Sequence, residues 1–210
     1  MSRTSMLGMV ALLAIGCVPQ AKYDQLQKQN QRLRKRVNRM EAVAESRLQT
    51  LRDLQQELSP LINRGVLEIR IVDGQIMLEL SSDILFQSGS AELSADGKKT
   101  LSQIASILSR RSDRKYQVEG HTDDDPIATD QFPNNWYLGA ARAIVVSEHM
   151  IDKGMSPRQI SAATYAAYRP HPSRNDARSR RIELVVVPDL SELPGYEQLV
   201  EEAEKARQNN

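Results

Sequence analysis

The sequence contains little cysteine, few aromatic residues and no hydrophobic run long enough to cross a membrane. Its only cysteine, Cys17, cannot form an internal disulfide. Aromatic residues make up 4% of the 210 residues and hydrophobic residues 40%, so aliphatic side chains must fill the core. A formal net charge of +1 gives no reason to expect nucleic acid as a partner. These features are typical of a soluble globular protein with one ordinary domain and extensions.

The N-terminus has the pattern of a bacterial export signal. Arg3 supplies a positive charge, residues 6–15 form an apolar run, and Gly16 is a small residue directly before Cys17. This run is too short to span a bilayer, which needs about 20 apolar residues. The segment AIGC resembles the lipobox of bacterial lipoproteins, although Ala14 stands where leucine is usual.

The lipobox resemblance implies that residues 1–16 are removed as a signal peptide and that Cys17 carries the lipid. Val18 stands directly after the cysteine. A residue other than aspartate at this position resembles the pattern of lipoproteins that are sorted to the outer membrane. The alternative is an ordinary signal peptide with a chance cysteine. We therefore expect a lipid-anchored protein on the periplasmic face of the outer membrane.

Residues 17–58 are expected to form the anchored N-terminus and a coiled-coil stalk. Apolar residues repeat in heptads without an intervening glycine or proline, which predicts a helix of roughly 57 Å. Asn30 at an a position favours parallel pairing and hence a homo-oligomer. The alternative is a single amphipathic helix packed on the domain. The a positions are Tyr23, Asn30, Val37, Ala44, Leu51 and Leu58, and the d positions are Leu26, Leu33, Met40, Arg47 and Leu54.

Ser59, Pro60 and Gly65 interrupt the helical pattern, so residues 59–65 are expected to form a linker. A globular domain is expected at residues 66–188. An acidic tail should follow at residues 189–210, and its amphipathic stretch from 196 to 206 is either disordered or a helix for a partner.

Alternating strand and helix patterns within the globular domain predict an α+β fold with helices packed on a mixed sheet. Asp73 and Gly74 form a favoured two-residue turn between the first two strands, and Ser94 is the expected N-cap of the first long helix. Strands are expected at 66–72, 75–80, 116–120, 159–165 and 181–187, and helices at 93–108 and 134–150.

Four segments within residues 80–188 resemble, in the same order, motifs of the OmpA-like domain. That family includes outer-membrane protein A, the peptidoglycan-associated lipoprotein and the flagellar stator B subunit. The resemblance implies a βαβαβ-type sandwich and binding of peptidoglycan without catalysis. A stator subunit would also need a spanning helix with a proton-accepting aspartate, which the apolar run does not supply. The segments are LFQSGSAEL at 85–93, GHTDDDPI at 120–127, NNWYLGAARA at 134–143 and SRRIEL at 179–184.

The resemblance also implies a site for diaminopimelate, whose free end carries an ammonium and a carboxylate on one carbon. Asp123 matches the family aspartate that meets the ammonium, and Arg142 matches the arginine that meets the carboxylate. Arginine suits this role because its planar guanidinium can donate two parallel hydrogen bonds to a carboxylate. Asp124 and Asp125 leave open which acid contacts the ligand.

Helical spacing places further site residues beside the arginine. Asn135, Leu138 and Arg142 are separated by three and four residues, so they share one helix face. We expect Asn135 to hydrogen-bond polar groups of the ligand and Leu138 to contact its methylene groups. Thr122 is expected to position the loop. The alternative is that Asp123 and Arg142 merely form a salt bridge at the surface.

No residue pattern predicts an enzyme, a metal site or a cofactor. His121 beside the aspartates could suggest a metal site, but His149 and His171 lie far away in the sequence and no metal-ligand spacing is present. We therefore expect His121 to be structural. The predicted function is non-catalytic binding of peptidoglycan that tethers the outer membrane to the wall. The alternative is a scaffold lipoprotein whose coiled coil recruits a trans-envelope partner, with wall binding used only for localisation.

Overall fold

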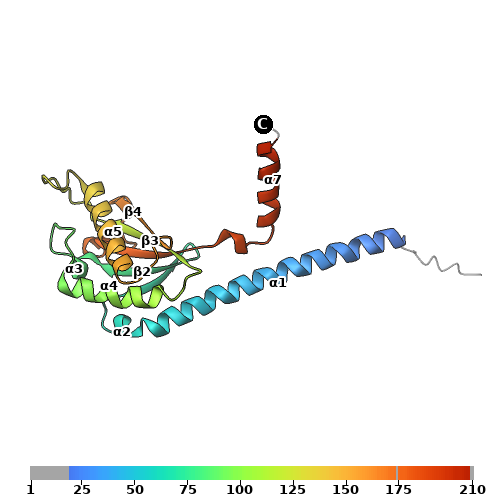
Figure 1. Ribbon diagram of the computed structural model, residues 1–210, viewed down its shortest axis with the longest axis horizontal. Helices are drawn as coiled ribbons and strands as arrows, with labels where there is room; N and C mark the ends of the chain where they lie inside the picture. The colour runs from blue at the N-terminus through green and yellow to red at the C-terminus, as the bar shows by residue number, and fades with distance from the viewer. Residues whose placement is uncertain (1–18, 174, 209–210) are drawn as a thin grey trace, which may run out of the picture.

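The computed structural model describes residues 19–173 and 175–208. The long helix α1 (Gln20–Glu57) leads into an α+β domain, and α7 (Tyr196–Gln208) follows that domain at the other end (Figure 1). Within these residues, no helix combines the length and the apolar character that a membrane span requires. The expected signal peptide and the expected lipid-bearing Cys17 lie outside the described residues.

A five-stranded mixed sheet, ordered β1-β2-β5-β3-β4, forms the centre of the domain. β3 and β4 are parallel, and all other neighbouring strands are antiparallel. The predicted α+β class with a mixed sheet is confirmed, and each predicted strand lies within about two residues of an observed one. The strands are β1 (Glu68–Val72), β2 (Gln75–Ser81), β3 (Lys115–His121), β4 (Ile160–Ala166) and β5 (Arg181–Val187).

The turn between β1 and β2 has the geometry that its sequence predicts. Asp73 and Gly74 both have positive φ angles, of 51° and 75°. Two successive left-handed residues are the mark of a type I′ turn, whose twist matches that of the strands it joins. The resulting register pairs Val72 with Gln75, so the predicted hairpin is confirmed.

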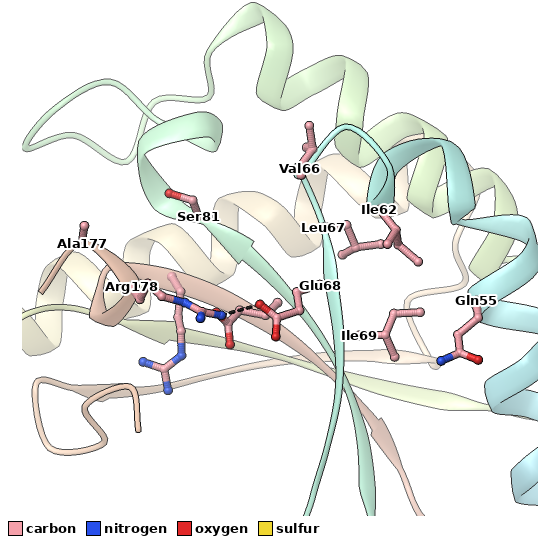
Figure 2. A pocket seen from close by; sticks show the side chains of 12 residues that line it. Gln55, Ile62, Val66, Leu67, Glu68, Ile69, Ser81, Ala177 and Arg178 are labelled. Carbon is pink, nitrogen blue, oxygen red and sulfur yellow. Dashed lines mark hydrogen bonds and ion pairs between the residues drawn. The ribbon is translucent and has the colours of Figure 1, made fainter. Parts of the chain in front are cut away.

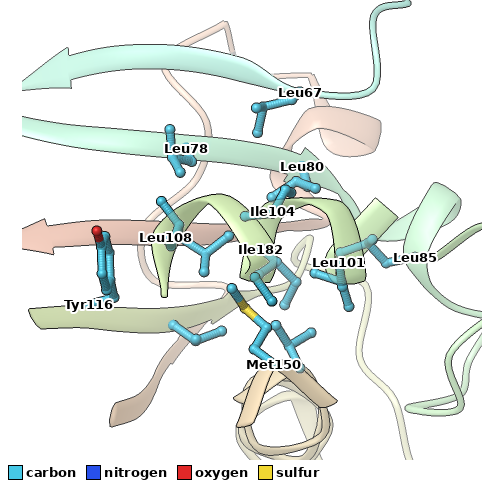
Figure 3. Packing of buried hydrophobic residues seen from close by; sticks show 14 of the residues in the cluster. Leu67, Leu78, Leu80, Leu85, Leu101, Ile104, Leu108, Tyr116, Met150 and Ile182 are labelled. Atoms are coloured by element: carbon cyan, nitrogen blue, oxygen red, sulfur yellow. The ribbon is translucent and has the colours of Figure 1, made fainter. Parts of the chain in front are cut away.

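Two long helices, α4 (Ala95–Leu108) and α5 (Asn135–Asp152), pack against one face of the sheet (Figure 1). The side chain of Ser94 accepts a hydrogen bond from the Gly97 amide at 2.8 Å, which confirms the predicted N-cap. Asn134 caps α5 in the same way. Between these helices and the sheet lies an aliphatic core that includes Leu78, Leu80, Leu101, Ile104, Leu108, Met150 and Ile182 (Figure 3).

The last turns of α1 belong to this core and not to a free stalk. Leu54 and Leu58 are fully buried in the same cluster as Leu67 and Leu78. The side chain of Glu57 forms ion pairs with Arg110 and Arg111, which follow α4. The last d and a positions of the heptad pattern, Leu54 and Leu58, therefore pack in the domain and are not available to a partner helix. The coiled coil itself stays a prediction for the part of α1 before them.

The segment expected to be a linker is partly helical. α2 (Ser59–Ile62) follows α1 directly, and Leu61 within it is buried in the main core. Pro60 is compatible with this short helix because it lies in the first turn, where a backbone amide has no helical partner. Residues 59–65 thus connect α1 to the sheet by a packed turn.

The N-terminal part of α1 leaves its heptad face open. Tyr23, Leu33 and Met40 are 57%, 51% and 59% exposed, and Leu26 and Val37 are exposed to a similar degree. The helix projects away from the sheet (Figure 1), so the alternative of a helix packed along the domain applies only to its C-terminal end. Pairing with a second copy remains a prediction.

The C-terminal tail contains a helix. The 3₁₀ turn η1 (Leu190–Glu192) leads to α7, which has no buried residue and stands apart from the domain (Figure 1). Of the two expectations for residues 196–206, a disordered tail or a partner helix, the structure has a helix.

Candidate functional site

The loop after β3 begins with Thr122, which is held by two hydrogen bonds to backbone carbonyl groups. Thr122 is buried, and its amide donates a hydrogen bond to the carbonyl oxygen of Ala166 at 3.0 Å. Its hydroxyl donates to the carbonyl oxygen of Asp123 at 2.8 Å. These two contacts fix the direction of the chain after it leaves the sheet, and so the direction of the Asp123 side chain.

Asn135, in the first turn of α5, is engaged by this loop. Its Nδ2 donates to the carbonyl oxygens of Asp123 and Asp125, at 3.2 and 2.9 Å. Its Oδ1 accepts from the amide of Ile127 at 3.3 Å. These contacts satisfy loop backbone groups that would otherwise lack partners, so Asn135 positions the loop. Its contact with a ligand stays a prediction.

Arg142 lies two turns further along α5 and is 5% exposed. Its Nε donates to the carbonyl oxygen of Ser90 at 2.9 Å, and its guanidinium carbon lies 5.0 Å from the centre of the Phe86 ring. Its two Nη atoms form no hydrogen bond or ion pair with any residue that the structure describes. The guanidinium is therefore held in place from one side, and its fork remains available to a ligand.

Leu138 shares the helix face of Arg142, as its spacing predicts. It is 6% exposed and packs in a small apolar cluster with Ala91 and Phe132. This packing holds the segment before α4 against α5, and that segment carries the carbonyl group that orients Arg142. Contact between Leu138 and methylene groups of a ligand stays a prediction.

Arg180, which the sequence analysis did not identify as a site residue, connects two acids at this site. Its Nη1 donates to Asp123 Oδ2 at 2.8 Å. Its Nε and Nη2 donate to the two carboxylate oxygens of Asp83, at 3.2 and 2.9 Å. Asp83 belongs to the short helix α3 (Ser82–Leu85), and Arg180 directly follows α6 (Asp176–Ser179). The available sequence signal was the SRR motif, which gave no indication of these partners.

The charges at the site influence one another. Burial lowers the pKa of Arg142, while Asp83 and Asp123 act in the opposite direction and Arg180 lowers it further. Hydrogen bonds from Arg180 to Asp83 and Asp123 raise the pKa of Arg180 above its usual value. Both guanidinium groups carry a positive charge at neutral pH because arginine does not deprotonate there.

The described residues contain no ion pair between Asp123 and Arg142, the alternative that the sequence left open. Asp123 pairs with Arg180 through one oxygen, and its side chain is 12% exposed. The arrangement therefore presents a partly satisfied carboxylate and a guanidinium with an open fork. Such a pair can hold an ammonium and a carboxylate on one molecule.

An open hollow of 380 Å³ borders the site loop and is lined by Asp124, Asn135, Trp136 and Tyr168, among others. The rings of Trp136 and Tyr168 stack with their centroids 5.6 Å apart, and the two side chains are 46% and 76% exposed. Trp136 is the only tryptophan of the chain, so its fluorescence can report on ligand binding at this loop.

A second cavity, of 530 Å³, lies away from this site (Figure 2). It is lined by the end of α1, β1, β2 and α6. Its charged groups all have partners, since Arg178 binds Glu68 and Glu79, and Arg181 binds Glu183 outside the cavity. The groups that match the expected chemistry are those at Asp123 and Arg142, so we place the candidate site there.

The OmpA family model matches residues 85–183, which include Asp123, Arg142 and Arg180. A peptidoglycan-associated lipoprotein from Pseudomonas putida is 30% identical over 121 residues, which cover 54% of this chain and 70% of that protein. The chain belongs to the OmpA family.

Other relatives support the same assignment over part of their length. Motility protein B of Bacillus subtilis is 27% identical over 127 residues, which cover 58% of this chain and 49% of that protein. The chain thus spans about half the length of the Motility protein B relatives that it matches. The cell wall anchor of the T6SS from Pseudomonas aeruginosa superposes with a TM-score of 0.58 at 27% identity, covering 65% of this chain and 97% of that one.

The OmpA-like domain also has a serine–histidine contact that the sequence did not indicate. Ser173 Oγ lies 2.7 Å from His171 Nδ1, and the Ser173 amide donates to the same nitrogen at 3.2 Å. A ring nitrogen that accepts from a backbone amide closes a local turn. This contact therefore explains the turn and does not by itself indicate a nucleophile.

The sheet face opposite α4 and α5 carries buried charges. Glu183 on β5 accepts a hydrogen bond from Arg181 Nε at 2.8 Å, and His121 Nε2 lies 3.3 Å from its other oxygen. Burial raises the pKa of Glu183, but the contacts of its carboxylate with His121 and Arg181 outweigh burial and lower the pKa to about 2. The carboxylate is thus ionised and stabilising at neutral pH.

We expect Glu183→Gln to lower the free energy of unfolding by about 3 kcal/mol at pH 7, because it leaves the buried guanidinium of Arg181 without its anionic partner. A carboxyl whose pKa falls from 4.5 to about 2 on folding stabilises the protein above about pH 4.5, and this contribution disappears as the pH falls through about 2. The difference between variant and parent should therefore shrink over that interval. Urea unfolding at several pH values measures it, with the exposed Glu148→Gln as control. A difference independent of pH would contradict this prediction.

Proposed function

We propose that the OmpA-like domain binds peptidoglycan through the diaminopimelate of its peptide stem and carries out no chemistry on it. The observation that carries this proposal is the held but open guanidinium of Arg142, whose pKa burial lowers and the charge of the Asp123 carboxylate raises. The P. putida relative is named a peptidoglycan-associated lipoprotein and the P. aeruginosa structure is a cell wall anchor, which supports a wall ligand.

The free end of diaminopimelate is a zwitterion, and each of its charges has a candidate partner. The ligand carboxylate would receive two hydrogen bonds from the Nη atoms of Arg142, in the bidentate geometry that arginine favours. The ligand ammonium would donate to the Asp123 oxygen that Arg180 does not occupy. Arg180 orients the Asp123 carboxylate through its hydrogen bond, while Thr122 and Asn135 hold its loop.

The tethering part of the proposal joins this site to the outer membrane. α1 contains 38 residues, so at 1.5 Å per residue it is about 57 Å long, and the part before its packed last turns lies between the expected lipid attachment at Cys17 and the domain. Its last turns are packed into the core, so a pull on the helix would be transmitted directly to the domain. The lipobox resemblance of the N-terminal segment supports the anchor.

Co-sedimentation with purified sacculi tests the proposal. The full chain should pellet with sacculi whose stems contain diaminopimelate, and incubation should release no soluble wall fragments. Sacculi whose stems contain lysine are the matched control, since the end of that side chain carries an ammonium without a carboxylate. Equal pelleting with both walls would refute the diaminopimelate site.

The open heptad face of α1 favours a second function, that of a scaffold whose helix recruits a trans-envelope partner. Leu33→Glu with Val37→Glu would place charges on this face without touching the domain. In-cell crosslinking then separates the two functions. A tether alone keeps its wall contact and loses no specific protein partner, whereas a scaffold loses one.

A further inference from the structure

β3 and β5 bring two glutamates and a histidine together on the sheet face that is turned away from α4 and α5. The register pairs Glu119 with Glu183 and His121 with Arg181. The neighbouring positions Val118, Ile182 and Leu184 point into the aliphatic core, so by strand alternation the charged residues lie on the other face. Glu119, His121 and Glu183 are 4%, 0% and 4% exposed.

The polar atoms of these three side chains converge. His121 Nε2 lies 3.3 Å from Glu183 Oε2 and 3.7 Å from Glu119 Oε2, and one ligand atom of each residue lies within 4.8 Å of the others. A tetrahedral ion with bonds of about 2.0 to 2.1 Å holds its ligand atoms about 3.3 Å apart. Both distances from the imidazole are longer than the usual hydrogen bond of about 2.9 Å.

Several of these buried atoms lack a hydrogen-bond partner among the residues that the structure describes. They include Glu119 Oε2 and both ring nitrogens of His121. Leaving one buried polar group unpaired costs about 1–3 kcal/mol, so this arrangement calls for a partner. The ring of His121 stacks on Tyr165 with centroids 5.6 Å apart, which fixes the direction in which Nε2 points.

The remaining neighbours leave these atoms open. Gln117 donates to Glu119 Oε1 at 2.8 Å, and Arg181 donates to Glu183 Oε1, so in each carboxylate the Oε2 atom is the one that faces the histidine. The charged nitrogen nearest to Glu119 Oε2 is Arg169 Nη1, which lies 4.0 Å away on a side chain that is 55% exposed. At this distance Arg169 forms no hydrogen bond with Glu119 Oε2.

We propose that Glu119, His121 and Glu183 form a binding site for a divalent transition metal ion of the Zn²⁺ type. One neutral imidazole and two carboxylates are a common ligand set for such ions. The ion would join β3 to β5 just before the Thr122–Asp123 loop and just after Arg180, and so would stiffen the strand ends that carry the candidate wall site. The proposed metal site does not depend on wall binding, and it is tested separately from wall binding.

Titration of the metal-stripped full chain with Zn²⁺ by calorimetry tests the site. We expect one ion bound per chain, and a loss of affinity of more than about 10-fold in the isosteric variant Glu119→Gln, because even residues that only orient metal ligands contribute about that much. Glu148→Gln is the matched carboxylate control, and His149→Asn tests for binding at a surface histidine. Unchanged Zn²⁺ binding in Glu119→Gln would place the ion elsewhere and overturn the proposal.

A spectroscopic measurement on the unaltered chain makes the test independent of how the variants fold. Co²⁺ in place of Zn²⁺ should give the intense visible absorption of a four-coordinate ion, and the ¹⁵N resonance of His121 Nε2 should shift on Zn²⁺ addition. If His121 instead titrates as an imidazolium between the two carboxylates and does not respond to Zn²⁺, the site binds a proton and the proposal is wrong. Wall binding would be unaffected by that result.

Discussion

Arg142→Ala is expected to weaken binding of the full chain to diaminopimelate-containing stem peptides by about 30-fold or more. Truncating one member of a buried, hydrogen-bonded charge pair costs about 2–5 kcal/mol, and every 1.4 kcal/mol is a factor of ten in affinity. The free Nη atoms of Arg142 are the groups that would grip the ligand carboxylate. Trp136 lies in the first turn of the same helix, so its fluorescence provides the titration signal.

Arg142→Lys distinguishes charge from geometry. Lysine keeps the positive charge but cannot form two parallel hydrogen bonds, so we expect an affinity between those of the parent and the alanine variant. Because Arg142 Nε also holds the Ser90 carbonyl group, circular dichroism and urea unfolding must show that both variants are folded. A folded Arg142→Ala variant with the affinity of the parent would remove Arg142 from the proposed site.

Gly120→Ala should be the most destabilising single methyl addition in the domain. A Cβ at this position would lie 2.1 Å from the carbonyl oxygen of Gly139, which is backbone and cannot rotate away. β3 and α5 would have to separate, so we expect a loss of about 3 kcal/mol or more in the free energy of unfolding, at the upper end of overpacking effects. Urea unfolding measures this loss.

Gly139→Ala provides the contrast. Its Cβ would lie 2.3 Å from Thr164 Oγ1, a side-chain atom that the further change Thr164→Ala removes. We expect that second change to restore part of the stability in Gly139→Ala and none in Gly120→Ala. Equal restoration in both would show that the backbone approach of β3 and α5 is not the limiting contact. Gly120 lies two residues before the loop that begins at Thr122, and α5 carries Arg142, so the same close approach positions the loop relative to Arg142.

Local patterns in the sequence were sufficient for the elements of the fold. The alternation in β5 and the Asp73-Gly74 turn are properties of neighbouring residues, and the Ser94 cap acts within one helical turn. The end of α1 could not be predicted in this way, because Leu54 and Leu58 satisfy a coiled-coil heptad and a domain core equally well. Only the surrounding tertiary structure shows which of the two they serve.

The site was predictable in its main charges and not in its connections. The motifs identified Asp123 and Arg142, but Arg180 meets Asp123 and Asp83 from positions 57 and 97 residues away. Such contacts depend on the strand order β1-β2-β5-β3-β4, which no local pattern encodes. The same holds for Glu119 and Glu183, which read as ordinary strand residues until the register places them opposite each other.

Competitive elution tests the central claim most directly. The full chain, bound to sacculi, is washed with stem peptides that differ only in carrying diaminopimelate or lysine. The account predicts that the diaminopimelate peptide releases the protein and that the lysine peptide does not, because only the former presents both charges to Arg142 and Asp123. Release by both peptides to the same extent, or by neither, would contradict it.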